Sequence, residues 1–555
     1  NYIQSLQTSC LKKGVLAKKM HSMISGAVTV EGIKRELETR GIKISQDDLE
    51  KVHIETVENI YKKIVYLAAG YQDLLLRVHE FEAMFERTKA EFLVRKFESN
   101  PLLNTYIQQE ISDIRELIAR VLHEFRDRLV ATDSEDKPDI EHSIQVVSDY
   151  YRVLLSRTAA LVTCADWQAV SYGASCRPNV VDSEELDYTG KLAYKRVSYP
   201  ALEKREAEFL EECVDSDKKD RLCTLITGSG QSAFNTVEGV ITKFLLEEGD
   251  TIAYLEGGYY ETSYFSSLVK GFKCLKFKDR NAEELVEEIT RNNVRYIAVE
   301  PIYNADRIHT VDVGEVLRLL DSLELDRDIF VVVDNSMLGG ACQPFNLKLS
   351  NPHVKIFLVE SLVKYRQMGL DRTNAGVLVA DQEYRGKLVA IRAAIGGVIQ
   401  DSSLHALPLM ARKLYEDRMD DLSTNAKFVA GKLRQFTQEH MTAVVDVDYP
   451  NSDTYRFSGA VFTLIVDKSF GLDRDNAHEF IKLVIQRAAA CGLSINHGTS
   501  FGFETTRIAF ADTDGGTFEN TYLRFSIGRE SKKDLLILVK ILQDCIVDFF
   551  SKKTT

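Results

Sequence analysis

The chain has 555 residues, of which 45% are hydrophobic and 28% charged, and its formal net charge is −13. A chain of this length exceeds what one hydrophobic core usually organises, so two or three domains are expected. The negative charge argues against non-specific binding to nucleic acid or to an anionic membrane, because neutralising phosphates requires clustered Lys and Arg. No apolar run approaches the roughly 20 residues of a membrane-spanning helix.

The nine cysteines are scattered along the chain and form no C-x-x-C pair. This distribution argues against a disulfide scaffold and against a thiolate metal site, so no metal is expected, and it favours a reducing compartment. The first residues show no signal-peptide pattern. We therefore expect a folded, cytoplasmic protein.

The first 160 residues are expected to be helical. Apolar residues recur there at steps of three and four, which places them on one helix face. The first stripe is Ile54, Val57, Tyr61, Ile64, Ala68, Tyr71, Leu75, Val78, Phe81 and Phe85. The second stripe is Ile107, Ile111, Ile114, Ile118, Val121, Phe125 and Leu129. The break at Asn100-Pro101 predicts an antiparallel helix pair, and a third helix around 144–155 is expected to pack on it.

The pattern changes to apolar β-type runs between residues 220 and 380, with helical stretches between several of them. The runs are 222–227, 251–255, 296–300, 329–333, 355–359 and 376–379. Continuous apolar strands that alternate with helices predict an α/β fold with a mostly parallel sheet. In such sheets ligands bind beyond the carboxyl ends of the strands.

The remainder mixes helices with the strand runs 459–466 and 522–528, which predicts a closing α+β domain. The expected domains are a helical N-terminal extension at 1–160, a large domain with a preceding arm at 161–415, and a small domain at 416–555.

GSGQSA at 228–233 follows a strand and opens a helix, so it fits the dinucleotide pattern G-x-G-x-x-A, and Glu256 ends the next strand. Backbone N–H groups at a helix N-terminus suit a phosphate, although a tight structural turn has the same composition. A nucleotide-dependent oxidoreductase using an NAD(P) cofactor is therefore one alternative.

Asp334 ends the strand in VVVDNS, and Lys364 follows the next strand in SLVKY. Alone, Asp334 is read as a helix cap, and S-x-x-K also matches a serine-nucleophile pattern that lacks its companion motifs here. Together, a carboxylate and an amine at neighbouring strand ends can hold a planar cofactor, with the acid on a pyridinium nitrogen and the lysine bound to its aldehyde.

These motifs, in their order, resemble the fold-type I pyridoxal-phosphate (PLP) enzymes of Cys/Met metabolism, which include cystathionine γ-synthase, cystathionine lyases and methionine γ-lyase. The matching segments are YKR at 194–196, SGQSA at 229–233, YYET at 259–262, EPIYNA at 300–305, VDNS at 333–336, SLVKY at 361–365 and LRFSIG at 523–528. The resemblance covers roughly residues 185–555. It does not include the N-terminal helical region.

The resemblance implies PLP as cofactor and a role for each matched residue. Lys364 is similar to the lysine that carries the cofactor and moves protons, and Asp334 to the partner of the ring nitrogen. Tyr259 is similar to the stacking tyrosine and Asn304 to the asparagine near the ring oxygen. The catalytic residues implied are Lys364, Tyr259 and Tyr194.

The remaining matched residues are implied to bind phosphate or substrate. Arg524 is similar to the arginine that binds the substrate α-carboxylate. The phosphate residues implied are Ser229, Gly230, Gln231 and Ser361, with Tyr194 and Arg196 reaching into a neighbouring subunit. The active unit is then at least a homodimer, or a homotetramer.

The implied activity is that of a lyase or transferase acting on an amino acid through an external aldimine, by β/γ-elimination or γ-replacement. Several positions depart from the family pattern: Val363 replaces threonine, Tyr260 replaces glycine and Ala305 replaces proline. These departures favour an unusual amino-acid substrate, as in specialised metabolism. An aminotransferase and a non-catalytic scaffold remain alternatives.

Overall fold

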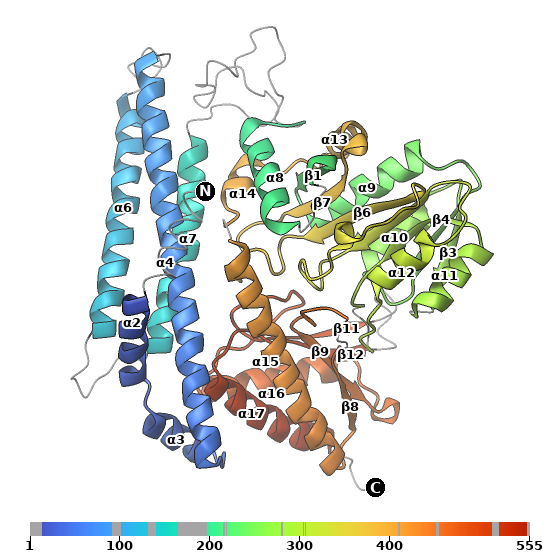
Figure 1. Ribbon diagram of the computed structural model, residues 1–555. Coiled ribbons are helices and arrows are strands. Elements are labelled where there is room, and N and C mark those ends of the chain that lie inside the picture. Colours follow the sequence, from blue (N-terminus) through green and yellow to red (C-terminus); the bar gives the residue numbers. More distant parts are fainter. Residues whose placement is uncertain are drawn as a thin grey trace. The chain divides into compact units, whose positions relative to one another are not determined.

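The structure is a computed structural model (Figure 1). It describes residues 14–91, 101–130, 140–164, 197–214, 217, 219–278, 281–303, 305, 307–408, 411–450, 454–512 and 521–551. Within these residues, every helix is too short or too polar to cross a membrane.

The chain forms two compact units, neither of them continuous in sequence. Unit 1 comprises residues 1–202, 400–414 and 531–533. Unit 2 comprises residues 203–399, 415–530 and 534–555. The division into three domains at residues 160 and 415 stays a prediction.

Unit 1 is helical, as the apolar spacing predicts. Its helices are α2 (Gly14–Ala27), α3 (Val30–Thr39), α4 (Gln46–Glu91), α6 (Pro101–Val130), α7 (Ile140–Cys164) and α14 (Asp401–His405). Helix α7 packs against both α4 and α6, and α6 runs antiparallel to α4 (Figure 1). The described residues of the stripe on α6 are buried from Ile107 to Phe125, as predicted.

The buried face of α4 matches the predicted one in part: Val57, Ile64, Tyr71, Val78 and Phe81 are buried, as predicted. Ile54 is 64% exposed and Leu75 37% exposed. The buried positions recur at alternating steps of three and four: Val57, Ile60, Ile64, Leu67, Tyr71, Leu74, Val78 and Phe81. Helix α4 packs against α7, and the hydroxyl of Tyr71, which belongs to both the predicted and the observed stripe, donates to the Val147 carbonyl oxygen at 2.9 Å.

Unit 2 is built on a seven-stranded sheet of order β1-β7-β6-β5-β4-β2-β3. Its strands are β1 (Leu222–Thr227), β2 (Thr251–Leu255), β3 (Lys273–Phe277), β4 (Val294–Val299), β5 (Ile329–Asp334), β6 (Val354–Ser361) and β7 (Gly376–Asp381). Strand β7 is antiparallel to its neighbours and the other pairings are parallel. The predicted α/β fold class with a mostly parallel sheet is confirmed.

The one strand of this sheet that the apolar runs did not predict is β3. It lies at the sheet edge, and exposed lysines at its first and fourth positions flank the half-buried Cys274 and Leu275, so it has no continuous apolar run. The central strands are buried along nearly their whole length because helices cover the sheet.

The helices of unit 2 that accompany this sheet connect its strands or follow it. They are α9 (Gly230–Phe244), α10 (Tyr260–Leu268), α11 (Ala282–Arg291), α12 (Val313–Asp321) and α13 (Arg385–Ala394). Two further helices, α8 (Pro200–Cys213) and α15 (Arg412–Glu439), begin in residues of unit 1 and continue into unit 2.

A second sheet in unit 2 has five strands in the order β10-β11-β12-β9-β8. They are β8 (Val444–Asp448), β9 (Val461–Val466), β10 (Asn496–His497), β11 (Arg507–Asp512) and β12 (Thr521–Ser526). With α16 (Arg474–Ala490) and α17 (Lys532–Phe550) they form the α+β part that the sequence predicts.

Candidate active site

Unit 2 contains a cavity of about 350 Å³ beyond the carboxyl ends of the parallel strands. Its lining residues come from both sheets and their loops: Ser229, Gly230, Gln231, Phe234, Tyr259, Glu300, Asp334, Ser336, Met337, Ser361, Val363, Lys364, Asn374, Thr499, Phe501 and Arg524. Every predicted site residue that the structure describes is in this set. Residues as far apart in sequence as Ser229 and Arg524 are therefore brought to one cavity.

Lys364 lies three residues after the end of β6 and lines the cavity. Its Nζ donates to the Ser500 hydroxyl at 3.1 Å and lies 5.0 Å from the centre of the Phe501 ring. Burial, and after it the positive charge of Arg524, lowers the pKa of Lys364 to about 8. A substantial fraction of the amine is then neutral, and thus nucleophilic, near physiological pH.

Ser500 is a residue that sequence reasoning missed. It lies in the loop between β10 and β11, outside the motifs matched in the sequence. Its neighbour Gly502 has a φ of +86°, and a Cβ there would lie 2.8 Å from the Lys364 carbonyl oxygen. The close approach of this loop to the lysine is what brings the Ser500 hydroxyl to the amine. In the sequence, the signal for this close approach is Gly502, two residues after Ser500.

Asp334 ends β5, in register with Val359 of β6. Burial raises the pKa of its carboxyl, although hydrogen bonding from Ser336 opposes this. The Ser336 backbone N–H donates to Asp334 Oδ1 at 2.9 Å, and the Ser361 N–H donates to the Ser336 hydroxyl at 2.8 Å. These two bonds fix the ends of β5 and β6 to each other at the cavity.

The N-terminus of α9 forms a cradle for an anion. Ser229 caps the helix by accepting from the Ser232 N–H at 3.0 Å, and Gly230 and Gln231 are its first two residues. A Cβ on Gly230 would lie 2.8 Å from the Ser361 Cβ, so only glycine lets the helix start approach the end of β6. The first N–H groups of a helix lack intrahelical partners and attract anions.

Tyr259 precedes α10 and is 46% exposed. Its backbone N–H donates to Glu300 Oε1 at 2.5 Å. Burial of part of the side chain, followed by the Glu261 carboxylate, raises the pKa of the phenol, so the ring is neutral at physiological pH. The Glu300 side chain thus fixes the backbone from which the Tyr259 ring enters the cavity.

Arg524 lies on β12, is 7% exposed and donates to the Thr499 carbonyl oxygen. Burial lowers its pKa. The ion pairs found among the described residues do not include Arg524, although a buried guanidinium without a carboxylate is costly. The arrangement is typical of a site whose missing carboxylate is supplied by a ligand.

Three predicted residues, Tyr194, Arg196 and Asn304, lie outside the described residues. Glu256, the candidate ribose ligand, is paired with Lys276 at 3.3 Å and with Lys278 at 3.9 Å, and it does not line the cavity.

Comparison with known proteins identifies relatives of most of the chain. A family model described as Cys/Met metabolism PLP-dependent enzyme matches residues 179–538. The bifunctional enzyme flvA of Aspergillus flavus is 26% identical over 393 residues, which are 70% of this chain. Those residues are 46% of the relative, so the chain matches less than half of that protein's length.

Solved structures show the same fold. Two crystal structures of cystathionine gamma synthase from Xanthomonas oryzae pv. oryzae, one in complex with aminoacrylate and cysteine and one in complex with cystathionine, each superpose with a TM-score of 0.50 at 19% identity. Each match covers 71% of this chain and 99% of the other.

Proposed function

Because the chain belongs to the Cys/Met metabolism PLP-dependent enzymes, we propose that it removes or replaces a group at Cβ or Cγ of an amino acid. The observation that carries the proposal is the cavity in which Lys364, Asp334 and Arg524 meet beside the α9 N-terminus. Lys364 is suited to the aldehyde of PLP, Asp334 to its ring nitrogen and Arg524 to the α-carboxylate of the amino acid.

The residues of the cavity fit the cofactor. The Gly230 cradle, which a Cβ would fill, accommodates the phosphate together with the Ser361 hydroxyl. The Asp334 carboxylate is suited to the ring nitrogen, the Tyr259 ring to the ring face and the Lys364 amine to the aldehyde. Among residues outside the described ranges, we propose that Tyr194 and Arg196 bind phosphate across a homo-oligomer interface, and that Asn304 contacts the ring oxygen.

The bound cofactor supplies an electron sink that acidifies the α-proton of an attached amino acid. The Lys364 amine accepts that proton and can deliver it elsewhere on the substrate. The Ser500 hydroxyl holds the amine during this transfer. Arg524 binds the substrate α-carboxylate and so orients the bond that breaks.

The departures at Val363 and Tyr260 support an unusual substrate. Val363 lines the cavity with a methyl group where the family pattern has a hydroxyl. Tyr260 follows the stacking tyrosine and is 48% exposed. An amino acid of specialised metabolism is therefore our proposed substrate class.

The first test is the visible absorption spectrum of the purified protein before and after borohydride, beside the Lys364→Ala variant. A band that borohydride bleaches and that the variant lacks is expected. A wild-type protein that stays colourless with added PLP would contradict the proposal.

The second test is a panel of amino acids with leaving groups at Cβ or Cγ, such as cystathionine and O-acylated homoserine. Elimination releases keto acid and leaving group together, and replacement requires an added nucleophile. Keto acid without a released leaving group would indicate an aminotransferase and overturn the proposed reaction.

A further inference from the structure

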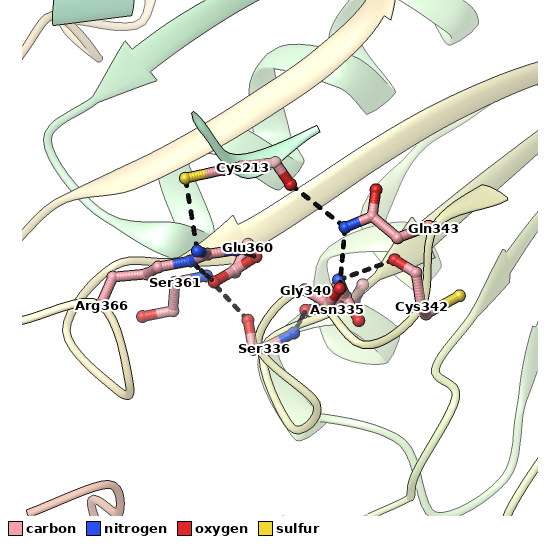
Figure 2. Close-up of polar contacts among 10 residues, drawn as sticks. Cys213, Asn335, Ser336, Gly340, Cys342, Gln343, Glu360, Ser361 and Arg366 are labelled. Carbon is pink, nitrogen blue, oxygen red and sulfur yellow. Dashed lines mark hydrogen bonds and ion pairs between the residues drawn. The ribbon is translucent and has the colours of Figure 1, made fainter. Parts of the chain in front are cut away.

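A buried ion pair flanks the SLVKY segment. Glu360 precedes Ser361 at the end of β6, and Arg366 follows Tyr365. Arg366 Nε donates to Glu360 Oε1 at 2.8 Å, and Nη2 donates to Oε2 at 3.4 Å (Figure 2). The two side chains are 3% and 9% exposed. Because successive strand residues face opposite sides of a sheet, Glu360 points away from the face on which Ser361 lines the cavity.

Arg366 contacts three further segments. Its Nη1 lies 3.3 Å from Cys213 Sγ at the end of α8. Its guanidinium lies 4.0 Å from the centre of the Tyr415 ring of α15. Gly340 has a φ of +92°, and a Cβ there would lie 2.5 Å from Arg366 Nη2, so glycine is required for the approach.

Gly340 belongs to the loop that follows Asp334, and this loop is also bonded to β6. The Asn335 N–H donates to the Val359 carbonyl oxygen at 2.8 Å. The Ser361 N–H donates to the Ser336 hydroxyl (Figure 2). The Ser336 N–H in turn donates to Asp334 Oδ1. The ion pair therefore lies where the segment that carries Lys364 meets the segment that carries Asp334.

We propose that the Glu360–Arg366 ion pair positions the cofactor site. It joins the SLVKY segment, which carries Lys364, to the loop that follows Asp334, and each member of the pair neutralises the buried charge of the other. The inference rests on the proposed roles of Lys364 and Asp334. Arg366 and Glu360 act through these residues and do not line the cavity themselves.

The Glu360–Arg366 pair is buried among other titratable groups. The titratable groups that face the pair are Cys213 from α8, Tyr415 from α15 and Asp334 from β5. Burial raises the pKa of Asp334, and the Glu360 charge raises it further. When one partner of a buried pair is removed, the charge of the other is uncompensated and acts on its neighbours at low effective dielectric.

The two single variants consequently have opposite electrostatic effects. Arg366→Met leaves a buried negative charge, which raises the pKa of groups at the cofactor. Glu360→Gln leaves a buried positive charge, which lowers the pKa of the same groups. A double variant carries neither charge. A purely structural role would instead move both single variants in the same direction.

The test measures the pH midpoint of the visible band of the PLP-loaded protein and the Kd of PLP for the cofactor-free protein. We expect the midpoint to rise by about one pH unit in Arg366→Met and to fall by a similar amount in Glu360→Gln. The double variant should return to within roughly 0.3 units of the wild type, and its Kd should be several-fold lower than that of Arg366→Met.

Arg327→Met is the control for loss of an arginine–carboxylate pair outside the site, because Arg327 is 40% exposed, pairs with Asp250 at 3.1 Å in the same unit and does not line the cavity. It should leave the midpoint unchanged. If Arg366→Met does not fold, Glu360→Gln alone tests the sign of the shift. If the wild type has the visible band and the midpoints of the two single variants shift in the same direction, or do not shift, this inference is overturned. A wild type without the band would overturn the proposed function instead.

Discussion

The Lys364 amine donates to the Ser500 hydroxyl at 3.1 Å, across 136 residues of sequence. Removing the acceptor in Ser500→Ala takes a hydrogen bond from the protonated amine, so the pKa of Lys364 should fall below about 8, by roughly one unit. The measurement is the pH dependence of the rate at which the cofactor-free protein captures PLP. Ser500→Thr keeps the hydroxyl and is the control; a midpoint in Ser500→Ala equal to the wild type would count against this role.

The stability of the cofactor-free protein should depend on pH through Lys364. Its pKa is about 8 in the folded chain against an ordinary lysine value of 10.5, so the unfolded state binds more protons between these limits. The cost of burying the charged amine is present below pH 8 and is lost as pH rises toward 10.5.

Lys364→Met should therefore be more stable than the wild type at pH 7, by on the order of 2 kcal/mol. The difference should shrink as pH rises from 8 to 10. Urea unfolding at several pH values measures it, and a difference that is constant with pH would show that the lysine is not desolvated.

Arg524→Lys should raise KM for the amino-acid substrate by about tenfold or more, because lysine cannot make the bidentate contact to a carboxylate. Arg524→Gln should weaken substrate binding further. It should also raise the pKa of Lys364, since the Arg524 charge contributes to lowering it. Steady-state kinetics and the PLP-capture profile measure the two effects. Unchanged KM in both variants would exclude Arg524 as the carboxylate ligand.

Gly230→Ala should lower PLP affinity by at least roughly tenfold, because the added Cβ would lie 2.8 Å from the Ser361 Cβ and 3.0 Å from its Cα. The affinity is measured by titrating cofactor-free protein. Gly431→Ala is the control: an added Cβ meets nothing within 4 Å in α15, so it should leave affinity unchanged and stabilise the helix by up to about 1 kcal/mol. Equal affinities in the two variants would argue against the cradle.

The positions of site residues that lie directly after a strand or at the start of a helix were predictable from the local sequence. Asp334 and Lys364 each follow a continuous buried strand, and Gly230 opens a helix directly after one, so their meeting at one sheet edge follows from parallel topology. The apolar runs likewise predicted six of the seven strands of the large sheet. These features were predictable because they depend only on residues that are close in sequence.

Features set by tertiary packing were not predictable. Ser500 reaches Lys364 because the loop between β10 and β11 approaches it, and no local pattern encodes that approach. The exact buried positions of α4 depend on which residues α7 covers: Ile60, Leu67 and Leu74 are buried where Tyr61, Ala68 and Leu75 were predicted. No local pattern around Glu360 and Arg366 predicts that the fold buries their side chains together as an ion pair.

Unit 1 is assembled from three separate stretches of the chain, and this has a consequence for how the protein can be divided. Arg77 of α4 donates to the carbonyl oxygens of His405 and Leu407, and Lys533 bonds to Glu36 and Glu141. Cutting the chain near residue 200 therefore does not release an independent module, because each fragment would keep surfaces made for the other. The helical unit needs segments from both sides of such a cut, so loss of either fragment should impair its folding.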